Sequence, residues 1–161
     1  MRLLLTGILR AALFLVLATS ASQSVATANP GTTLQVQFEF AANRNSLLLR
    51  ALVNGRPALL ILDTGAHTIL RPELVGAKRS EVSLARQPSA GGGFVGDAVA
   101  REVKLQIGGR VWQKYRISVM DLSEILASYS ENPDGLLGLD FLESYRQVTI
   151  DWRERRITLK Q

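Results

Sequence analysis

The alternation of apolar and polar residues along this chain predicts a protein built mainly from β-strands. Residues 34–40 alternate strictly between apolar and polar side chains, which is the period of a strand with one buried face. The mostly apolar segment 47–53 leads into Asn54-Gly55, a pair typical of tight hairpin turns, and the apolar run 57–62 follows. These two segments are therefore predicted to form a hairpin whose second strand is buried on both faces.

Further short strands are predicted downstream by the same periodicity or by β-branched residues, and the segments between them resemble hairpin turns. Gly108-Gly109 and residues 152–155 are two such turns. The strands are expected at residues 81–84, 98–107, 111–120, 148–150 and 157–159. Helix is scarce, with short helices expected at 121–129 and 139–145. Many short strands with little helix predict a mainly β fold, either a compact barrel or a sandwich.

Length and composition limit the possible chemistry. The chain has 161 residues, which is the size of one domain, and we find no internal repeat or interdomain linker. It has no cysteine, which excludes a disulfide scaffold, a thiolate zinc site and a cysteine nucleophile. A single histidine leaves little room for imidazole-based metal sites or catalytic triads. We therefore expect neither a metal nor a cofactor.

The first 28 residues are typical of a targeting segment. Arg2 and Arg10 lie before a short apolar run over residues 11–18. Residues 26–28 (Ala-Thr-Ala) match a signal-peptide cleavage site. The apolar run is too short for a good membrane span. We therefore expect a signal peptide, or an uncleaved signal anchor, over residues 1–28, followed by a single domain over 29–161. The expected location is the periplasm or the outside of the cell, with membrane contact only if the leader is uncleaved.

Charge does not favour nucleic acid as a partner. The formal net charge of +5 includes two arginines of the leader and therefore overstates the charge of the mature chain. Apart from Arg153, Arg155 and Arg156, the basic residues are scattered, and no basic face interleaved with aromatic residues is apparent.

A carboxylate stands at the end of the predicted buried strand. Asp63 directly follows five apolar residues, where an ionised group is costly unless it is hydrogen-bonded or shares a proton. Thr64 supplies a hydroxyl group, and Gly65 lets the backbone turn and bring an amide close to the carboxylate. Taken alone, Asp-Thr-Gly is equally consistent with an ordinary β-turn, so the remaining sequence has to decide.

A second motif lies in residues 136–138 (Leu-Leu-Gly), after a turn and before a predicted short helix. It predicts a buried strand whose glycine lets another chain segment pass close by. Residues 61–66 (Ile-Leu-Asp-Thr-Gly-Ala) followed by this motif resemble the signature of the retropepsin-like aspartic proteases. The resemblance covers roughly residues 34–159, including the terminal hairpin. It implies a compact closed β-barrel with one or two short helices.

The resemblance also implies a reaction and an assembly. Aspartic proteases hold two carboxylates close enough to share one proton, and hydrolyse peptide bonds with an activated water. This chain has one Asp-Thr-Gly, so the pair requires a homodimer with Asp63 of each copy at the two-fold axis. By the same resemblance, Thr64 hydrogen-bonds across the axis and Gly65 orients the carboxylate. The substrate is expected to be a peptide or protein. The alternative is an inactive dimeric module of the same fold that binds a peptide or envelope partner.

Residues 89–96 are rich in glycine, and we interpret them as a hairpin flap that folds over substrate. Gly91, Gly92, Gly93 and Phe94 are its candidate substrate-binding residues, with an ordinary loop as the alternative. The segment also fits the Gly-x-Gly-x-x-Gly pattern of dinucleotide sites. That interpretation fails because a strand, and not a helix, is predicted to follow.

Two positions after the motif are candidate substrate contacts. Ala66 matches the retroviral form of the loop, and His67 departs from the residues usual there. His67 is predicted either to line the substrate cleft or to lie on the surface without a role.

Other carboxylates receive structural explanations. Asp134 is expected to begin a turn, Asp140 to start the short helix or face its outside, and Asp151 to lie at a hairpin end. Transfer of a phosphoryl group through an aspartyl phosphate at Asp63 is discounted, since it requires a parallel α/β fold and a further carboxylate for Mg²⁺.

Overall fold

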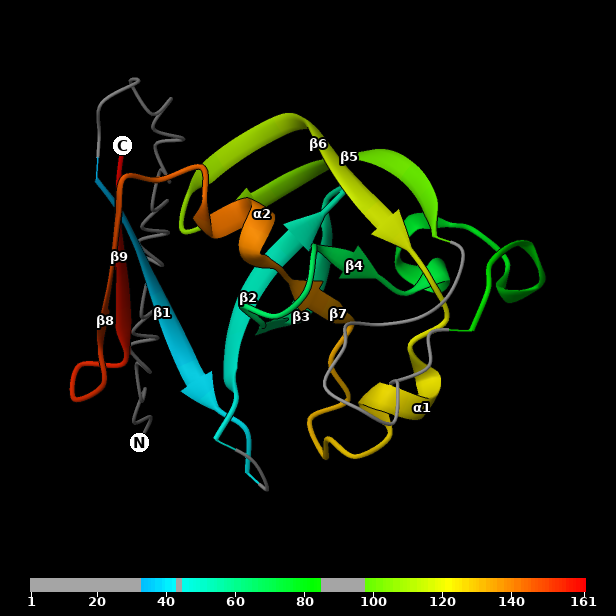
Figure 1. The fold of residues 1–161 in the computed structure, drawn as a ribbon, viewed down its shortest axis with the longest axis horizontal. Coiled ribbons are helices and arrows are strands. Elements are labelled where there is room, and N and C mark those ends of the chain that lie inside the picture. Colours follow the sequence, from blue (N-terminus) through cyan, green and yellow to red (C-terminus); the bar gives the residue numbers. More distant parts are fainter. Residues whose placement is uncertain (1–32, 43–44, 85–97) are drawn as a thin grey trace, which may run out of the picture.

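The computed structural model describes residues 33–42, 45–84 and 98–161, and within them the chain is mainly β (Figure 1). In these ranges two α-helices and two 3-10 helices, all short, interrupt the strands. The strands are β1 Leu34–Phe40, β2 Leu47–Val53, β3 Arg56–Leu62, β4 Ile69–Leu70, β5 Val99–Ile107, β6 Arg110–Val119, β7 Gly135–Leu137, β8 Gln147–Asp151 and β9 Arg156–Lys160. The helices are η1 Pro72–Val75, η2 Arg79–Glu81, α1 Ser123–Leu126 and α2 Leu139–Leu142.

Six of the strands close into a barrel. Neighbouring strands run in the order β3-β7-β4-β6-β5-β2, and β2 also pairs with β3, which completes the ring. Most pairs are antiparallel, but β3 pairs in parallel with β7, and β4 in parallel with β6. The predicted mainly β fold, a closed barrel with short helices, is therefore confirmed.

The other three strands form an arm beside the barrel, at the left of Figure 1. Strand β1 joins the barrel through antiparallel pairing with the start of β2, while its own first half pairs with β9. Strand β8 pairs with β9 and forms the outer strand of this arm. One strand thus belongs to both parts, so barrel and arm are joined by continuous hydrogen bonding.

Local sequence explains most of these elements. Along β1 the alternating residues Leu34, Val36 and Phe38 are buried, as the period of two predicts. Between β2 and β3, Asn54 and Gly55 both have positive φ (51° and 80°), the geometry of a type I′ hairpin turn. The two hairpin turns predicted at 54–55 and 108–109 are both confirmed.

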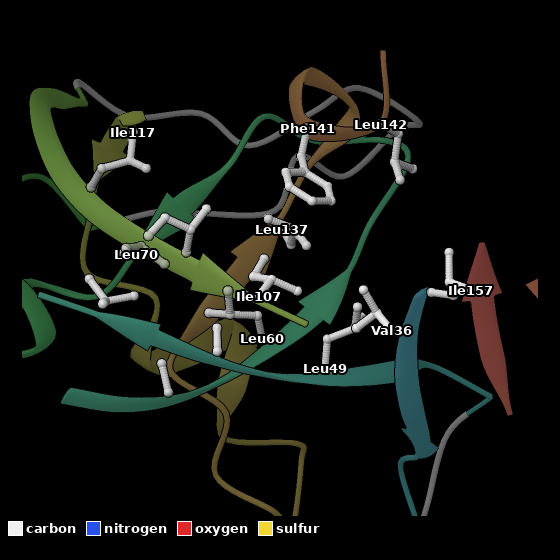
Figure 2. Close-up of a cluster of buried hydrophobic side chains, with 14 of the residues drawn as sticks. Val36, Leu49, Leu60, Leu70, Ile107, Ile117, Leu137, Phe141, Leu142 and Ile157 are labelled. Atoms are coloured by element: carbon white, nitrogen blue, oxygen red, sulfur yellow. The ribbon is translucent and has the colours of Figure 1, made fainter. Parts of the chain in front are cut away.

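The main hydrophobic cluster fills the barrel and extends under the arm (Figure 2). Leu60 from β3 and Leu137 from β7 are fully buried near its centre, and Phe141 from α2 covers them at one end. Val36 and Ile157 carry the same cluster into the arm. Because the two strands that lead to the candidate site contribute to this core, their relative position is fixed by close packing.

Three expectations about elements need correction. Residues 81–84 do not form a strand: Glu81 is the last residue of η2, and Leu84 makes one isolated bridge to Asp121. Strand β4 was not predicted, because two residues are too few to show a period. Both α-helices are shorter than expected. None of the described helices is long and apolar enough to cross a membrane.

Candidate active site

Asp63 lies directly after β3, where the parallel pairing with β7 ends. The last paired residues are Leu62 and Leu137, and the backbone N–H of Asp63 then donates to the carbonyl of Leu137 at 3.0 Å. This bond extends the ladder by one residue, so the backbone of Asp63 belongs to the barrel while its side chain lies beyond it. The side chain is half-buried. A carboxylate is thus held on rigid backbone at the rim of the core.

The carboxylate of Asp63 has few partners. Its Oδ1 accepts a hydrogen bond from the N–H of Gly65 at 2.8 Å, and among the described residues no other donor is within hydrogen-bond distance. A Cβ atom added at Gly65 would lie 3.3 Å from the same oxygen, which is a tight contact. The predicted approach of the Gly65 amide to this carboxylate is therefore present. The other carboxylate oxygen remains available to a further donor.

The turn after Asp63 is pressed against the segment that follows β7. A Cβ atom added at Gly138 would lie 2.2 Å from the carbonyl carbon of His67 and 2.4 Å from the carbonyl oxygen of Ala66. Real Cβ atoms do not approach backbone so closely, so only glycine allows the two segments to meet here. The N–H of Leu139 donates to the carbonyl of Ala66 at 2.8 Å. The predicted close passage at Gly138 is confirmed.

Three residues that sequence reasoning did not assign to the site complete this junction. Both the N–H and the hydroxyl of Thr68 donate to Oδ1 of Asp140, at 2.7 and 2.9 Å. The Thr68 hydroxyl in turn accepts from the N–H of Gly138 at 3.1 Å. The hydroxyl of Tyr115, on β6, donates to Oδ2 of Asp140 at 3.0 Å. Burial, with a further contribution from the charge of Asp140, raises the pKa of Tyr115 far above its usual range, so this hydroxyl keeps its proton.

The expectation for Asp140 was thus partly wrong. Asp140 does lie in the first turn of α2, but its carboxylate faces Thr68 and Tyr115 and is not directed outward. The signal that could have found Thr68 is its position directly before the apolar pair Ile69-Leu70. Its partner is 72 residues away in sequence, so no local pattern connects the two.

A second carboxylate serves the opposite end of the same strand pair. Asp134 precedes β7, and its Oδ2 accepts from the N–H of Leu59 at 2.8 Å. It also forms an ion pair with Arg71, in which the Asp134 side chain is 14% exposed. The expected turn at Asp134 is absent, since Gly135 is already the first residue of β7. The role of Asp134 is nevertheless structural, because its carboxylate joins β7, β3 and the residue after β4.

The structure brings together part of the predicted site. Asp63 and Ala66 are half-buried, while Thr64, Gly65 and His67 are exposed in the same turn. The predicted flap residues Gly91, Gly92, Gly93 and Phe94 lie outside the described residues. Within the described ranges, no group of three or more His, Cys, Asp or Glu side chains is arranged to hold a metal ion. What the turn offers chemically is one carboxylate and the hydroxyl of the exposed neighbour Thr64.

Comparison with known proteins decides the family. A family model described as aspartyl protease matches residues 49–141, a range that includes Asp63, Thr68, Gly138 and Asp140. The chain belongs to the aspartyl protease family. A search of curated protein sequences found none that is significantly similar to this chain.

The fold of this aspartyl protease family member is similar to that of a solved enzyme. A retropepsin-like aspartic protease from Rickettsia conorii aligns with a TM-score of 0.51 and 22% sequence identity, over 82% of this chain and 96% of that one. The predicted retropepsin-like fold is therefore confirmed.

Two further structures align with lower scores. The EIAV protease, solved in complex with the inhibitor HBY-793, has a TM-score of 0.41 and 22% identity, over 66% of this chain and 93% of its own. The retroviral protease-like domain of Ddi1 from Leishmania major has a TM-score of 0.43 and 13% identity, over 73% and 95%.

Proposed function

We propose that this protein is an aspartic endopeptidase that is active as a homodimer, with Asp63 of each copy forming the catalytic pair. The observation that carries the proposal is the state of the Asp63 carboxylate. Rigid backbone holds it at the end of β3, and among the described residues it is bonded to the Gly65 amide and to no other donor. A half-buried carboxylate with an open oxygen is costly unless a substrate, water or second carboxylate uses it. Membership of the aspartyl protease family supports the same reaction.

The need for two copies follows from the sequence. The chain has one Asp-Thr-Gly and one set of residues 136–138, and the six-stranded barrel is built from a single such unit. A pair of carboxylates sharing a proton therefore requires a second chain. The exposed position of Thr64 and Gly65 leaves this turn accessible to a partner copy. In the proposed dimer Thr64 bonds across the axis and Gly65 orients the carboxylate.

The proposed reaction uses the two carboxylates in different protonation states. The ionised Asp63 takes a proton from water as the water oxygen bonds to the carbonyl carbon of the scissile peptide. The protonated Asp63 of the other copy donates its proton to the carbonyl oxygen, which gives a tetrahedral diol. The C–N bond then breaks as the amine nitrogen receives a proton from one carboxyl group and a diol hydroxyl returns a proton to the other. The balance is one water consumed and one acid and one amine released.

The proposed substrates are peptides or unfolded protein segments outside the cytoplasm. The targeting segment predicted over residues 1–28 supports an extracytoplasmic address. Ala66 and His67 follow the proposed catalytic turn directly and are the proposed substrate contacts among the described residues.

The decisive experiment compares Asp63→Asn with wild type on an unbiased peptide library. Asn cannot accept or supply the catalytic proton, so we expect cleavage to fall about 10²- to 10⁴-fold while the melting temperature stays unchanged. The matched control is Asp151→Asn. The Oδ1 of Asp151 accepts from the N–H groups of Arg153 and Glu154 at the β8–β9 turn, and Asn retains such an oxygen. This control should cleave as wild type does.

Cleavage by Asp63→Asn at the wild-type rate would contradict the catalytic assignment. Sedimentation of the purified protein, with and without a hydroxyl-containing peptide mimic, tests the assembly separately. A strict monomer under both conditions would remove the shared pair. A dimer that binds the mimic but cleaves no peptide would support the inactive binding module.

A further inference from the structure

The junction between the candidate catalytic turn and α2 contains an unusual side chain. Within the described part of the chain, Thr68 is the one buried polar side chain, with 2% of its surface exposed. Its hydroxyl both donates and accepts, since it accepts from the Gly138 N–H and donates to Asp140. Without this hydroxyl, the buried N–H of Gly138 would lose its partner and Asp140 would lose a donor, so Thr68 contributes to stability. The same hydrogen bonds also attach the end of the Asp63 turn to the segment that begins α2, and this attachment is a role distinct from stability.

The hydrogen bonds of this junction fix the whole turn that begins at Asp63. The turn is attached at its start by the Asp63 N–H to Leu137, in its middle by the Leu139 N–H to Ala66, and at its end by Thr68. Every one of these contacts reaches the short segment 137–140. Since backbone lies directly on backbone at Gly138, the turn has no room to slide toward this segment. Thr68 and Asp140 prevent it from moving away.

Asp140 is itself held from two sides. Thr68 occupies its Oδ1 twice, and Tyr115 occupies its Oδ2 from β6 on the barrel wall. The Tyr115 ring packs edge-on against Phe141, the residue after Asp140, with ring centroids 6.3 Å apart. The carboxylate can therefore neither rotate nor withdraw without breaking three hydrogen bonds. Through these bonds, the position of β6 in the barrel constrains the position of the turn that carries Asp63.

We propose that Thr68 and Asp140 are positioning residues that hold the Asp63 turn in the geometry needed for peptide hydrolysis. This inference rests on the proposed function and deepens it. Two carboxylates that share a proton across a dimer axis tolerate little displacement, and a misplacement of about 1 Å can cost about 100-fold in rate. Thr68 and Asp140 touch neither substrate nor water in this role. They act through the backbone of residues 63–68.

The test compares Thr68→Val with Thr68→Ser. Valine has the same shape but removes both hydrogen bonds of the hydroxyl, whereas serine keeps them and loses one methyl group. Rates are measured on a cleaved peptide at a temperature where melting curves show every variant fully folded. We expect Thr68→Val to lower kcat about 10- to 100-fold, with KM changed less than about twofold. Thr68→Ser should retain kcat within about threefold.

The matched control is Thr158→Val on β9, which makes the same chemical change in the arm, away from the site. It should leave kcat and KM unchanged. A merely structural role for Thr68 would alter the melting temperature and leave kcat intact under folded conditions, and this result would overturn the inference. If Thr68→Val does not fold, Tyr115→Phe replaces it, because it removes one bond to Asp140 and keeps the ring. Its expected loss in kcat is about two- to fivefold, and an unchanged kcat would overturn the inference.

A second measurement does not depend on activity. Amide hydrogen exchange of Gly65 and Leu139, followed by NMR, reports directly on the turn and on its contact with α2. We expect exchange to accelerate about tenfold in Thr68→Val and to stay unchanged in Thr68→Ser and Thr158→Val. If the wild type cleaves no peptide, the proposed function fails and this exchange result alone decides the positioning role. Unchanged exchange in Thr68→Val overturns the inference whether or not the protein is active.

Discussion

Two aspartates stand at opposite ends of one parallel strand pair and have opposite surroundings. Strands β3 and β7 pair from Leu60 with Gly135 to Leu62 with Leu137. Asp134, at one end, bonds to the backbone of Leu59 and forms an ion pair with Arg71. Asp63, at the other end, has one described hydrogen bond, from an amide two residues away. The same strand pair thus has one carboxylate whose oxygens are bonded within the fold and one with an oxygen available to a further donor.

The two aspartates differ in whether their carboxylates bond within the fold or stay open to a substrate. A carboxylate whose oxygens are saturated by internal donors stabilises the fold and has little left to offer a substrate. A carboxylate that is open needs other groups to hold its backbone, and here Gly138, Thr68 and Asp140 do so. Substitutions at the Asp134 end should therefore lower mainly stability, and substitutions in the Asp63 turn should lower mainly activity.

The largest effect is expected at the crossing beneath the open carboxylate. Gly138→Ala places a Cβ atom 2.2 Å from backbone that cannot move away. We expect a loss of stability of about 4 kcal/mol or more, seen as failure to fold or a much lower urea midpoint. A variant with a wild-type midpoint would mean that the two segments are not packed as described.

The next largest effect is expected at the saturated end. Asp134→Ala leaves the Leu59 N–H and the partly buried Arg71 without their partner, which should cost about 2–3 kcal/mol in urea unfolding. Asp134→Asn is the control, since it keeps an oxygen for the Leu59 N–H and should cost less. Peptide cleavage per folded molecule should stay at the wild-type value for both. A variant that stays stable but loses activity would reverse the roles of the two ends.

Gly65→Ala should lower activity more than stability, unlike the substitutions at Asp134. The backbone of Gly65 does not have positive φ, and the added Cβ atom would meet only the Asp63 carboxylate, at 3.3 Å. We expect a change in stability of about 1 kcal/mol or less, because the carboxylate can shift, and a drop in kcat of about tenfold for the same reason. Thermal melting and peptide kinetics on the same sample measure both. Equal losses in the two would argue that the turn serves stability.

The smallest effect concerns a further structural carboxylate, Asp121. Burial opposes its ionisation, but hydrogen bonds from Ser123 and the nearby Arg79 outweigh burial and hold the pKa of Asp121 below its usual value. A carboxyl whose pKa is lower in the folded state stabilises the fold above its unfolded pKa of about 3.9, and this contribution is lost as the pH falls through the folded value.

Asp121→Asn should therefore lower the melting temperature at pH 7 and leave it nearly unchanged at pH 2, by an amount worth less than about 1 kcal/mol. Melting curves of both proteins between pH 2 and pH 7 measure the difference. An equal difference at every pH would show that ionisation of Asp121 plays no part. Peptide cleavage at pH 7 should not change, as expected for a carboxylate that serves structure.

Much of the fold was predictable because its signals are local. The alternation in β1 and the turns at Asn54-Gly55 and Gly108-Gly109 depend on neighbouring residues alone. The prediction for Gly138 was correct as well, because a glycine in a buried strand-like run needs a reason such as a close backbone contact. The expected strand at 81–84 failed because its pairing partner offers a single bridge, which periodicity cannot reveal.

By itself, the sequence determined that a lone Asp-Thr-Gly ends a buried strand in a mainly β chain, because strand periodicity and turn preference depend on neighbouring residues. Only the tertiary structure decided which carboxylates are saturated and which is open. The sequence placed Asp140 at the start or on the outside of the short helix and assigned no role to Thr68, yet the two residues meet across 72 positions and hold the turn that carries Asp63. Hydrogen-bond saturation depends on which distant segments the barrel brings into contact, and closure of the barrel is a property of the whole chain.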